Sequence, residues 1–285
     1  EEAIKELQFL ENDGIDVNNI TVYFRLVLIT GDNLGLHAIL GFVESFSANF
    51  FCRMCKIHKS FIHAVLHERY CTPRDEDSYH EDVNKNNVTL TGINSLCILN
   101  AHFLSFHAIH NIFVDIMHDL TEGVVKYDVE LILSYFVELK LFSWSFLNDR
   151  LNGFDYDDND QRSRPTTTQL RSMSASEVFL YLRILPLLIG NRVELKDEHW
   201  NLIILLKMIT EIAFSKSVHK KAHFLLASLI EEYLETLNKL FPDYPLKPKH
   251  HFMVHMPQVL RTMGPLGNIC SLRPEGKHRW GKIVS

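Results

Sequence analysis

The sequence predicts a small α/β segment followed by a mostly α-helical block. A run of β-branched, aromatic and aliphatic residues at 20–30 is typical of a strand buried inside a sheet, and helix-like segments lie on either side of it. Between about residues 100 and 242, apolar residues instead recur at helical spacing. This order of patterns favours an α/β piece followed by a separate helical block.

The first part of the chain is expected to run helix, strand, helix, strand. Apolar positions predict an amphipathic helix over 2–12, and turn-forming residues separate it from the strand at 20–30. A brief helix is predicted over 33–46 and a second short strand over 48–55. Asp32 comes at the end of the first strand, so it could cap the helix or be a carboxylate that the strand positions.

The second part of the chain contains the helical signals. We expect one helix or two over 112–139 and single helices over 174–190, 197–214 and 219–241. An acidic run at 154–168 is expected to be a solvated loop. Prolines break up the region after residue 242, and a last helix is predicted to begin at Pro274. The stripes of Leu, Ile and Phe are most simply the core of a bundle.

Charge and composition argue against some classes of protein. The net charge of −6 argues against a free-standing protein that binds DNA non-specifically through many phosphate contacts. No run of about 18 apolar residues is present, so we expect a soluble protein without a membrane span. The chain starts without Met or a signal sequence and ends within a predicted helix, so we expect a fragment of a longer protein.

The cysteines favour metal binding or burial over disulfides. The chain has five cysteines, which is an odd number, and it has no secretory signal. Cys52 and Cys55 have the two-residue gap of half a zinc site. Partners could be local, from His58, His63, His67 and Cys71, or distant, with His255 joined by His250 or His251. The resulting H-x3-H or H-x4-H spacing would put two imidazoles on one face of a helical turn. The alternative is that these are buried thiols and solvated histidines.

Two further groups could carry chemistry. Asp115 and His118 share a helical face near Asp119 and Glu122, although a capping Asp and a partly buried His would give the same pattern. Glu275 lies in the first turn of the predicted last helix, where the helix dipole favours a carboxylate whatever its role. Positive charge around it suits a phosphate-bearing partner. These basic residues are Arg273, Lys277, His278, Arg279 and Lys282.

The ordered set of motifs resembles the catalytic core of eukaryotic cut-and-paste DNA transposases, which have an RNase H-like fold. The segments "LITGDNLGLHAILGF", "DIMHDLTEGVV", "LKPKHHFMVH" and "GPLGNICSLRPEGKHRW" are most similar to the CACTA (En/Spm) type. The order of CxxC, paired His and final Glu also resembles the catalytic subunit of the V(D)J recombinase. The resemblance extends over about residues 1–285, and its specificity lies in the set rather than in any one motif.

The resemblance implies a fold, roles and partners. It implies a partial RNase H-like fold interrupted by a helical insertion domain, with residues 1–56 in the sheet, 57–256 in the insertion and 257–285 opening the terminal catalytic helix. Asp32 and Glu275 would be the second and third carboxylates of a DDE triad that binds Mg²⁺ or Mn²⁺, and His118 would lie nearby. Structural Zn²⁺ would be held by Cys52, Cys55, His255 and either His251 or His250.

Transposon ends and target DNA would be the partners, with Arg273, Lys277, His278 and Arg279 as contacts. The protein would act in the nucleus as a homodimer or a larger synaptic assembly. The first Asp of the triad has no strand to carry it in this chain, so we expect residues 1–285 alone to cleave no DNA. One alternative is a catalytically silent scaffold derived from a transposase that binds DNA or protein. Another is a zinc hydrolase using Asp115, His118 and a third ligand, although the HExxH spacing is absent.

Overall fold

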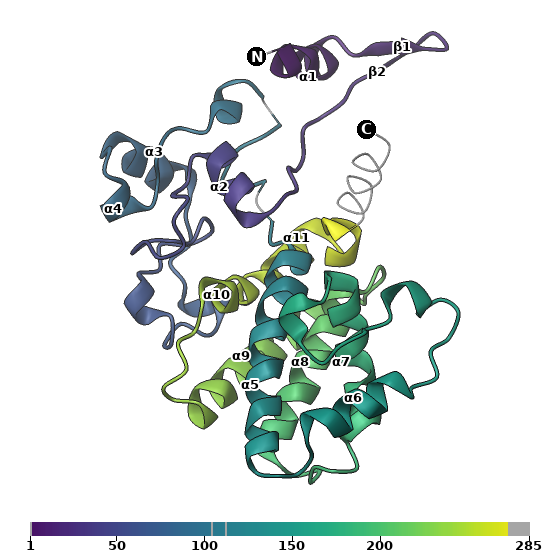
Figure 1. Ribbon diagram of the computed structural model, residues 1–285. Coiled ribbons are helices and arrows are strands. Elements are labelled where there is room, and N and C mark those ends of the chain that lie inside the picture. The colour runs from purple at the N-terminus through teal and green to yellow at the C-terminus, as the bar shows by residue number, and fades with distance from the viewer. Residues whose placement is uncertain (1, 104, 112, 273–285) are drawn as a thin grey trace. The chain divides into compact units, whose positions relative to one another are not determined.

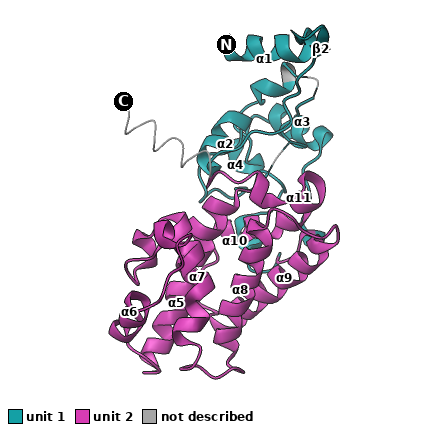
Figure 2. Ribbon diagram, turned by 90° about the vertical axis from the view of Figure 1, so that its right-hand side faces the viewer, with its two compact units in different colours: residues 1–65, 69–113 teal, residues 66–68, 114–285 magenta. Residues whose placement is uncertain are grey.

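The computed structural model describes residues 2–103, 105–111 and 113–272. The chain is mostly helical, and the described residues contain one sheet of two strands. It divides into two compact units, coloured separately in Figure 2: residues 1–65 with 69–113, and residues 66–68 with 114–285. The predicted division into residues 1–56, 57–256 and 257–285 stays a prediction.

The first unit has few regular elements. It contains helices α1 (Glu2–Asn12), α2 (Asn33–Leu40), α3 (Glu76–Asn84) and α4 (Val88–Thr91), short 3-10 helices at Lys59–Phe61 and Ile98–Ala101, and strands β1 (Ile15–Val17) and β2 (Ile20–Val22). The strands form an antiparallel hairpin in which Asp16 pairs with Thr21. Asn18 and Asn19 make its turn, with φ of 51° and 63°, values that Asn adopts more readily than most residues.

The predicted buried strand over 20–30 is wrong. Only Ile20–Val22 form a strand, and all three residues are exposed. Beyond them the chain has no regular structure until Asn33, and Tyr23 remains 61% exposed. Within the described residues no further strand pairs with this run or covers its faces, and an apolar run needs such neighbours to become a buried strand. An RNase H-like sheet therefore remains a prediction.

The second predicted strand, over 48–55, is also wrong. Its only regular pairing among the described residues is the isolated bridge between Cys55 and Pro73. The predicted helices agree better with the structure than the predicted strands do. α1 matches the prediction, and α2 begins at Asn33 as expected but ends at Leu40, because Gly41 takes the left-handed conformation with φ of 79°.

The second unit is helical, as the periodicity predicts. Its long helices are α5 (Val125–Glu138), α7 (Ala175–Ile189), α8 (Glu198–Phe214) and α9 (Ala222–Leu240), which lie side by side in Figure 1. The shorter elements are α6 (Trp144–Asn152), α10 (Pro248–Val254), α11 (Met256–Met263), the π-helix η4 (Met117–Val124), and 3-10 helices at Gln161–Ser163, Leu170–Ser172 and Leu266–Asn268. A 3-10 turn at Glu68–Tyr70 spans the division between the units.

The core of the second unit is built from the apolar stripes of these helices. Val129, Leu185, Leu206 and Leu237 come from four different helices and are all fully buried. Burying a leucine or valine side chain contributes about 1.5–3 kcal/mol, so these stripes favour the folding of the unit.

Candidate metal centre

The Cys52–Cys55 turn belongs to the first unit and is held by backbone contacts. The Met54 amide donates to Cys52 Sγ at 3.3 Å, and the Lys56 amide donates to the Thr72 carbonyl at 2.9 Å. Arg74 is buried and donates from Nε to the Cys52 carbonyl at 3.3 Å. Both thiols are therefore fixed in a buried turn, which is the arrangement that a CxxC ligand pair needs.

The thiol of Cys55 is protonated near neutral pH in the absence of a metal. Its contact with Cys52 acts to lower its pKa, but the contact with Cys71 and burial outweigh that effect and raise the pKa to about 12. A bound metal ion would replace the proton, because the thiolate is the form that ligates.

The two histidines of the candidate centre belong to the second unit. His251 lies within α10, and His255 directly follows that helix. Their Nε2 atoms are 3.2 Å apart. Two nitrogens bound to one zinc at about 2.0–2.1 Å with tetrahedral geometry would be roughly 3.3 Å apart. The spacing therefore suits two imidazoles that share an ion.

Glu68 orients the His255 ring. The Nδ1 atom of His255 lies 3.2 Å from Glu68 Oε1, so the ring donates its Nδ1 proton to the carboxylate and keeps a lone pair on Nε2. A carboxylate behind a histidine is the usual second partner of a metal-ligating imidazole.

Each unit thus supplies one half of a candidate metal site. The side chains of Cys52, Cys55, His251 and His255 are all buried. Two thiols and two imidazoles are soft or borderline donors, which suit zinc better than magnesium or calcium. Together these four residues could hold a metal ion such as zinc.

His250 has a different partner, so His251 is the member of the group. His250 Nε2 donates to Asp128 Oδ2 at 3.0 Å, and the amide of Lys247 donates to its Nδ1 at 2.9 Å. The Asp128 carboxylate also accepts from the hydroxyls of Tyr233 at 2.5 Å and Tyr244 at 2.9 Å. Both ring nitrogens of His250 are thus used within the second unit.

Asp115 and His118 interact with each other. His118 Nδ1 contacts Asp115 Oδ2, and Asp115 Oδ1 accepts from the Ser271 amide at 3.0 Å. Asp115 is fully buried, whereas His118 is partly exposed. The Asp115 side chain therefore joins η4 to the segment that follows α11 instead of capping a helix, and it leaves an oriented imidazole near the surface.

A lysine braces the same π-helix. Lys249 Nζ donates to the carbonyls of His118 at 2.7 Å and Glu122 at 3.1 Å. Burial lowers the pKa of Lys249, and Asp119 and Glu122 oppose that shift. Gly123 makes the contact possible, because a Cβ there would lie 2.5 Å from Lys249 Cδ.

Asp32 is the N-cap of α2. Its Oδ1 accepts from the Gly35 amide at 2.7 Å, and the side chain is exposed. The remaining predicted catalytic and DNA-binding residues lie outside the described residues: Arg273, Glu275, Lys277, His278 and Arg279.

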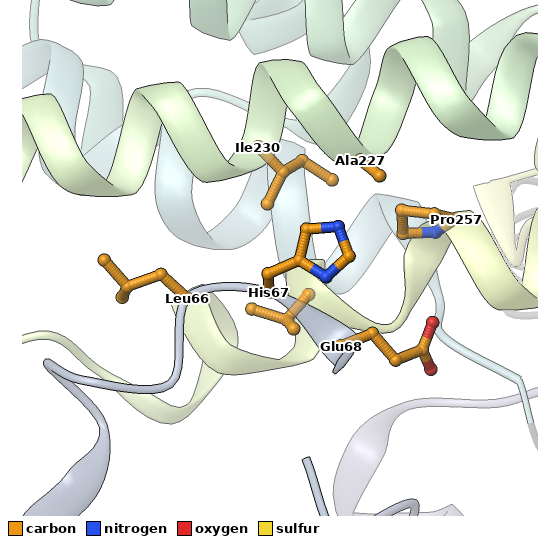
Figure 3. Close-up of a pocket in the computed structure, with 7 residues that line it drawn as sticks. Leu66, His67, Glu68, Ala227, Ile230 and Pro257 are labelled. Atoms are coloured by element: carbon orange, nitrogen blue, oxygen red, sulfur yellow. The ribbon is translucent and has the colours of Figure 1, made fainter. Parts of the chain in front are cut away.

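The nearby residues that could have completed a local zinc site with Cys52 and Cys55 have different surroundings. Cys71 contacts Cys55, whereas His58 caps a 3-10 helix by accepting from the Ser60 amide at 3.3 Å. His67 lines a cleft of about 30 Å³ in the second unit with Ile230 and Pro257 (Figure 3). None of these three belongs to a candidate metal group among the described residues.

Compared with protein-family models, curated proteins and solved structures, the chain matches none. The family resemblance therefore rests on the motifs themselves. In the described part of the chain, no helix combines the length and the apolar character that crossing a membrane requires.

Sequence reasoning missed a second group of side chains that could hold a metal ion. The donor atoms of Glu76, His107 and His110 also lie within 4.8 Å of one another. The spacing His107-x2-His110 was a usable signal. The contribution of Glu76 was not, because 30 residues separate it from His107, and only the way this segment folds brings the two together.

Proposed function

We propose that this chain is part of a DDE-type cut-and-paste DNA transposase, or of a protein derived from one, with a structural zinc ion held by Cys52, Cys55, His251 and His255. The observation that carries the proposal is the composition of the metal group. The motif resemblance implies a zinc site made from a CxxC pair and a histidine pair far away in the sequence. All four side chains are buried, and the Nε2 atoms of His251 and His255 lie 3.2 Å apart, a spacing that suits a shared zinc ion.

The zinc ion would be structural. The chain itself supplies four ligands, which fills a tetrahedral site and leaves no position for a reacting water. Burial of all four side chains supports the same role. The zinc hydrolase alternative is less well supported, because Asp115 and His118 belong to no candidate metal group among the described residues.

The proposed catalytic groups are Asp32 and Glu275, with His118 nearby. Magnesium or manganese ions held by these carboxylates would activate the attacking oxygen and stabilise the leaving oxygen of a DNA phosphodiester. Arg273, Lys277, His278 and Arg279 would contact DNA phosphates. The complete protein would work in the nucleus on transposon ends and target DNA, as a dimer or a larger assembly.

An excision assay tests this proposal. The full coding sequence of the gene would be expressed with a reporter carrying the matching transposon ends, and we expect excision that disappears in the Asp32→Asn and Glu275→Gln variants. Asp13→Asn is a matched control, because Asp13 is an exposed carboxylate in a turn. Excision that survives Asp32→Asn and Glu275→Gln would contradict the proposal.

A second candidate is a catalytically silent scaffold that binds DNA or protein. The net charge of −6 favours it, since an acidic chain does not gain affinity for DNA from its overall charge. A protein that binds zinc but gives no excision with any transposon end found beside its gene would support this candidate.

A further inference from the structure

Glu76, His107 and His110 gather on the surface of the first unit. His110 Nε2 lies 2.7 Å from Glu76 Oε1, and the rings of His107 and His110 have centroids 5.6 Å apart. One donor atom from each of the three lies within 4.8 Å of the other two. The side chains of His110 and Glu76 are 62% and 52% exposed, so a metal bound there would be open to water.

The backbone around these residues is well held. Glu76 is the first residue of α3, which Asp75 caps by accepting from the Ser78 amide at 2.8 Å. The His107 amide donates to Asn111 Oδ1 at 2.7 Å. The neighbouring Ala108 amide donates to Asn100 Oδ1 at 2.8 Å. Ligands on a fixed backbone lose little conformational freedom when they bind an ion.

One ring nitrogen of His107, Nε2, is available as a metal ligand. Its Nε2 is buried and has no hydrogen-bond partner among the described residues, and such an atom is costly to leave unsatisfied. The Ile109 amide donates to its Nδ1 at 3.2 Å. Metal binding through Nε2 would place the ring proton on Nδ1 and break that long contact, so a metal–nitrogen bond would replace one weak hydrogen bond.

We propose that Glu76, His107 and His110 form a second metal site, which binds a divalent transition metal such as Zn²⁺ or Co²⁺ with water completing its coordination. Two imidazoles and one carboxylate are a donor set typical of zinc and its neighbours, whereas calcium and magnesium prefer oxygen ligands throughout. This site is independent of the proposed transposase function and of the Cys52–Cys55 centre.

Cobalt titration of the zinc-loaded chain tests the proposal. We expect the chain to bind one additional Co²⁺ with visible d–d absorption and without the sulfur-to-cobalt charge-transfer band that thiolate ligands produce. The absence of that band shows that cobalt has not replaced zinc at Cys52 and Cys55.

Two surface variants assign the ligands. His110→Ala and Glu76→Gln should each weaken cobalt binding by about tenfold or more, because each removes one of three protein ligands. His102→Ala is the matched control, since His102 is an exposed histidine of the same unit outside the group, and it should bind cobalt as the unchanged chain does. Circular dichroism would confirm that all three variants are folded. Failure of the unchanged chain to bind cobalt, or equal binding by His110→Ala, would overturn the proposal.

Discussion

His250 and Asp128 form a fully buried pair, with His250 Nε2 3.0 Å from Asp128 Oδ2. The neighbouring residue, His251, instead has its Nε2 3.2 Å from that of His255. The two adjacent histidines of α10 thus have different roles. His250 joins the helix to α5, and His251 faces the second imidazole of the candidate metal centre.

We expect the two histidines to differ when each is replaced. His251→Ala should abolish zinc binding, because it removes one of four ligands. His250→Ala should lower stability yet keep the zinc. Zinc content by mass spectrometry and thermal unfolding of the two variants provide the comparison. Loss of zinc in His250→Ala at a temperature where the variant is folded would show that the assignment of His251 is wrong.

The Asp128 carboxylate is expected to be a major contributor to stability. It is buried and accepts hydrogen bonds from Tyr233, Tyr244 and His250. Burial raises the pKa of Tyr233 well above its ordinary value, so the hydroxyl stays a donor. Asp128→Asn replaces an acceptor oxygen with a donor, and we expect a loss of about 3 kcal/mol in the free energy of unfolding.

Glu130→Gln is the control for Asp128→Asn. Glu130 lies on the same helix and forms an ion pair with Arg171 that is largely exposed. Exposed pairs contribute little, so we expect this change to alter stability by less than about 1 kcal/mol. Urea unfolding of both variants measures the difference, and equal losses would contradict a special role for the buried carboxylate.

His37 should make stability depend on pH. Burial and the charge of Arg53 lower its pKa to about 3, although the bond to the Val43 carbonyl opposes the shift. The native ring is therefore neutral at pH 5, whereas the unfolded ring takes up a proton below about 6.5. Unfolding gains that proton, so stability falls as pH drops from 6.5 towards 3, by about 1.4 kcal/mol per pH unit.

His37→Gln should reduce the dependence of unfolding free energy on pH by the equivalent of about one proton taken up on unfolding, whatever it does to stability at pH 7. Leu40→Val serves as the control, because it changes a buried, non-titrating side chain of the same helix and should leave the slope unaltered. Denaturant unfolding between pH 5 and 7 gives the slopes. The same slope for His37→Gln and the unchanged chain would rule out His37 as the source.

Zinc binding should release a proton. Cys55 has a pKa of about 12 without a metal, and the ligating form is the thiolate. At pH 7 we expect zinc binding to release the proton of the Cys55 thiol, and we expect weaker binding as pH falls. Calorimetry in buffers of different ionisation enthalpy detects the released proton. Heats that do not depend on the buffer would contradict ligation by Cys55.

The helical parts of the fold could be predicted from local pattern, because a helix satisfies its own backbone. α7, α8 and α9 follow the predicted segments closely. The run at 20–30 failed for the opposite reason, since a buried strand depends on neighbours that its own residues do not specify. The same limit applied to the metal centre: the choice between His250 and His251 depends on Asp128, which lies 122 residues away.

The metal content of the purified chain, combined with X-ray absorption at the zinc edge, tests the central claim most directly. We predict one tightly held zinc ion surrounded by two sulfurs and two nitrogens, which is lost in Cys55→Ser and in His255→Ala. A folded chain that holds no zinc, or zinc that stays in place with an unchanged spectrum in Cys55→Ser, would contradict the claim.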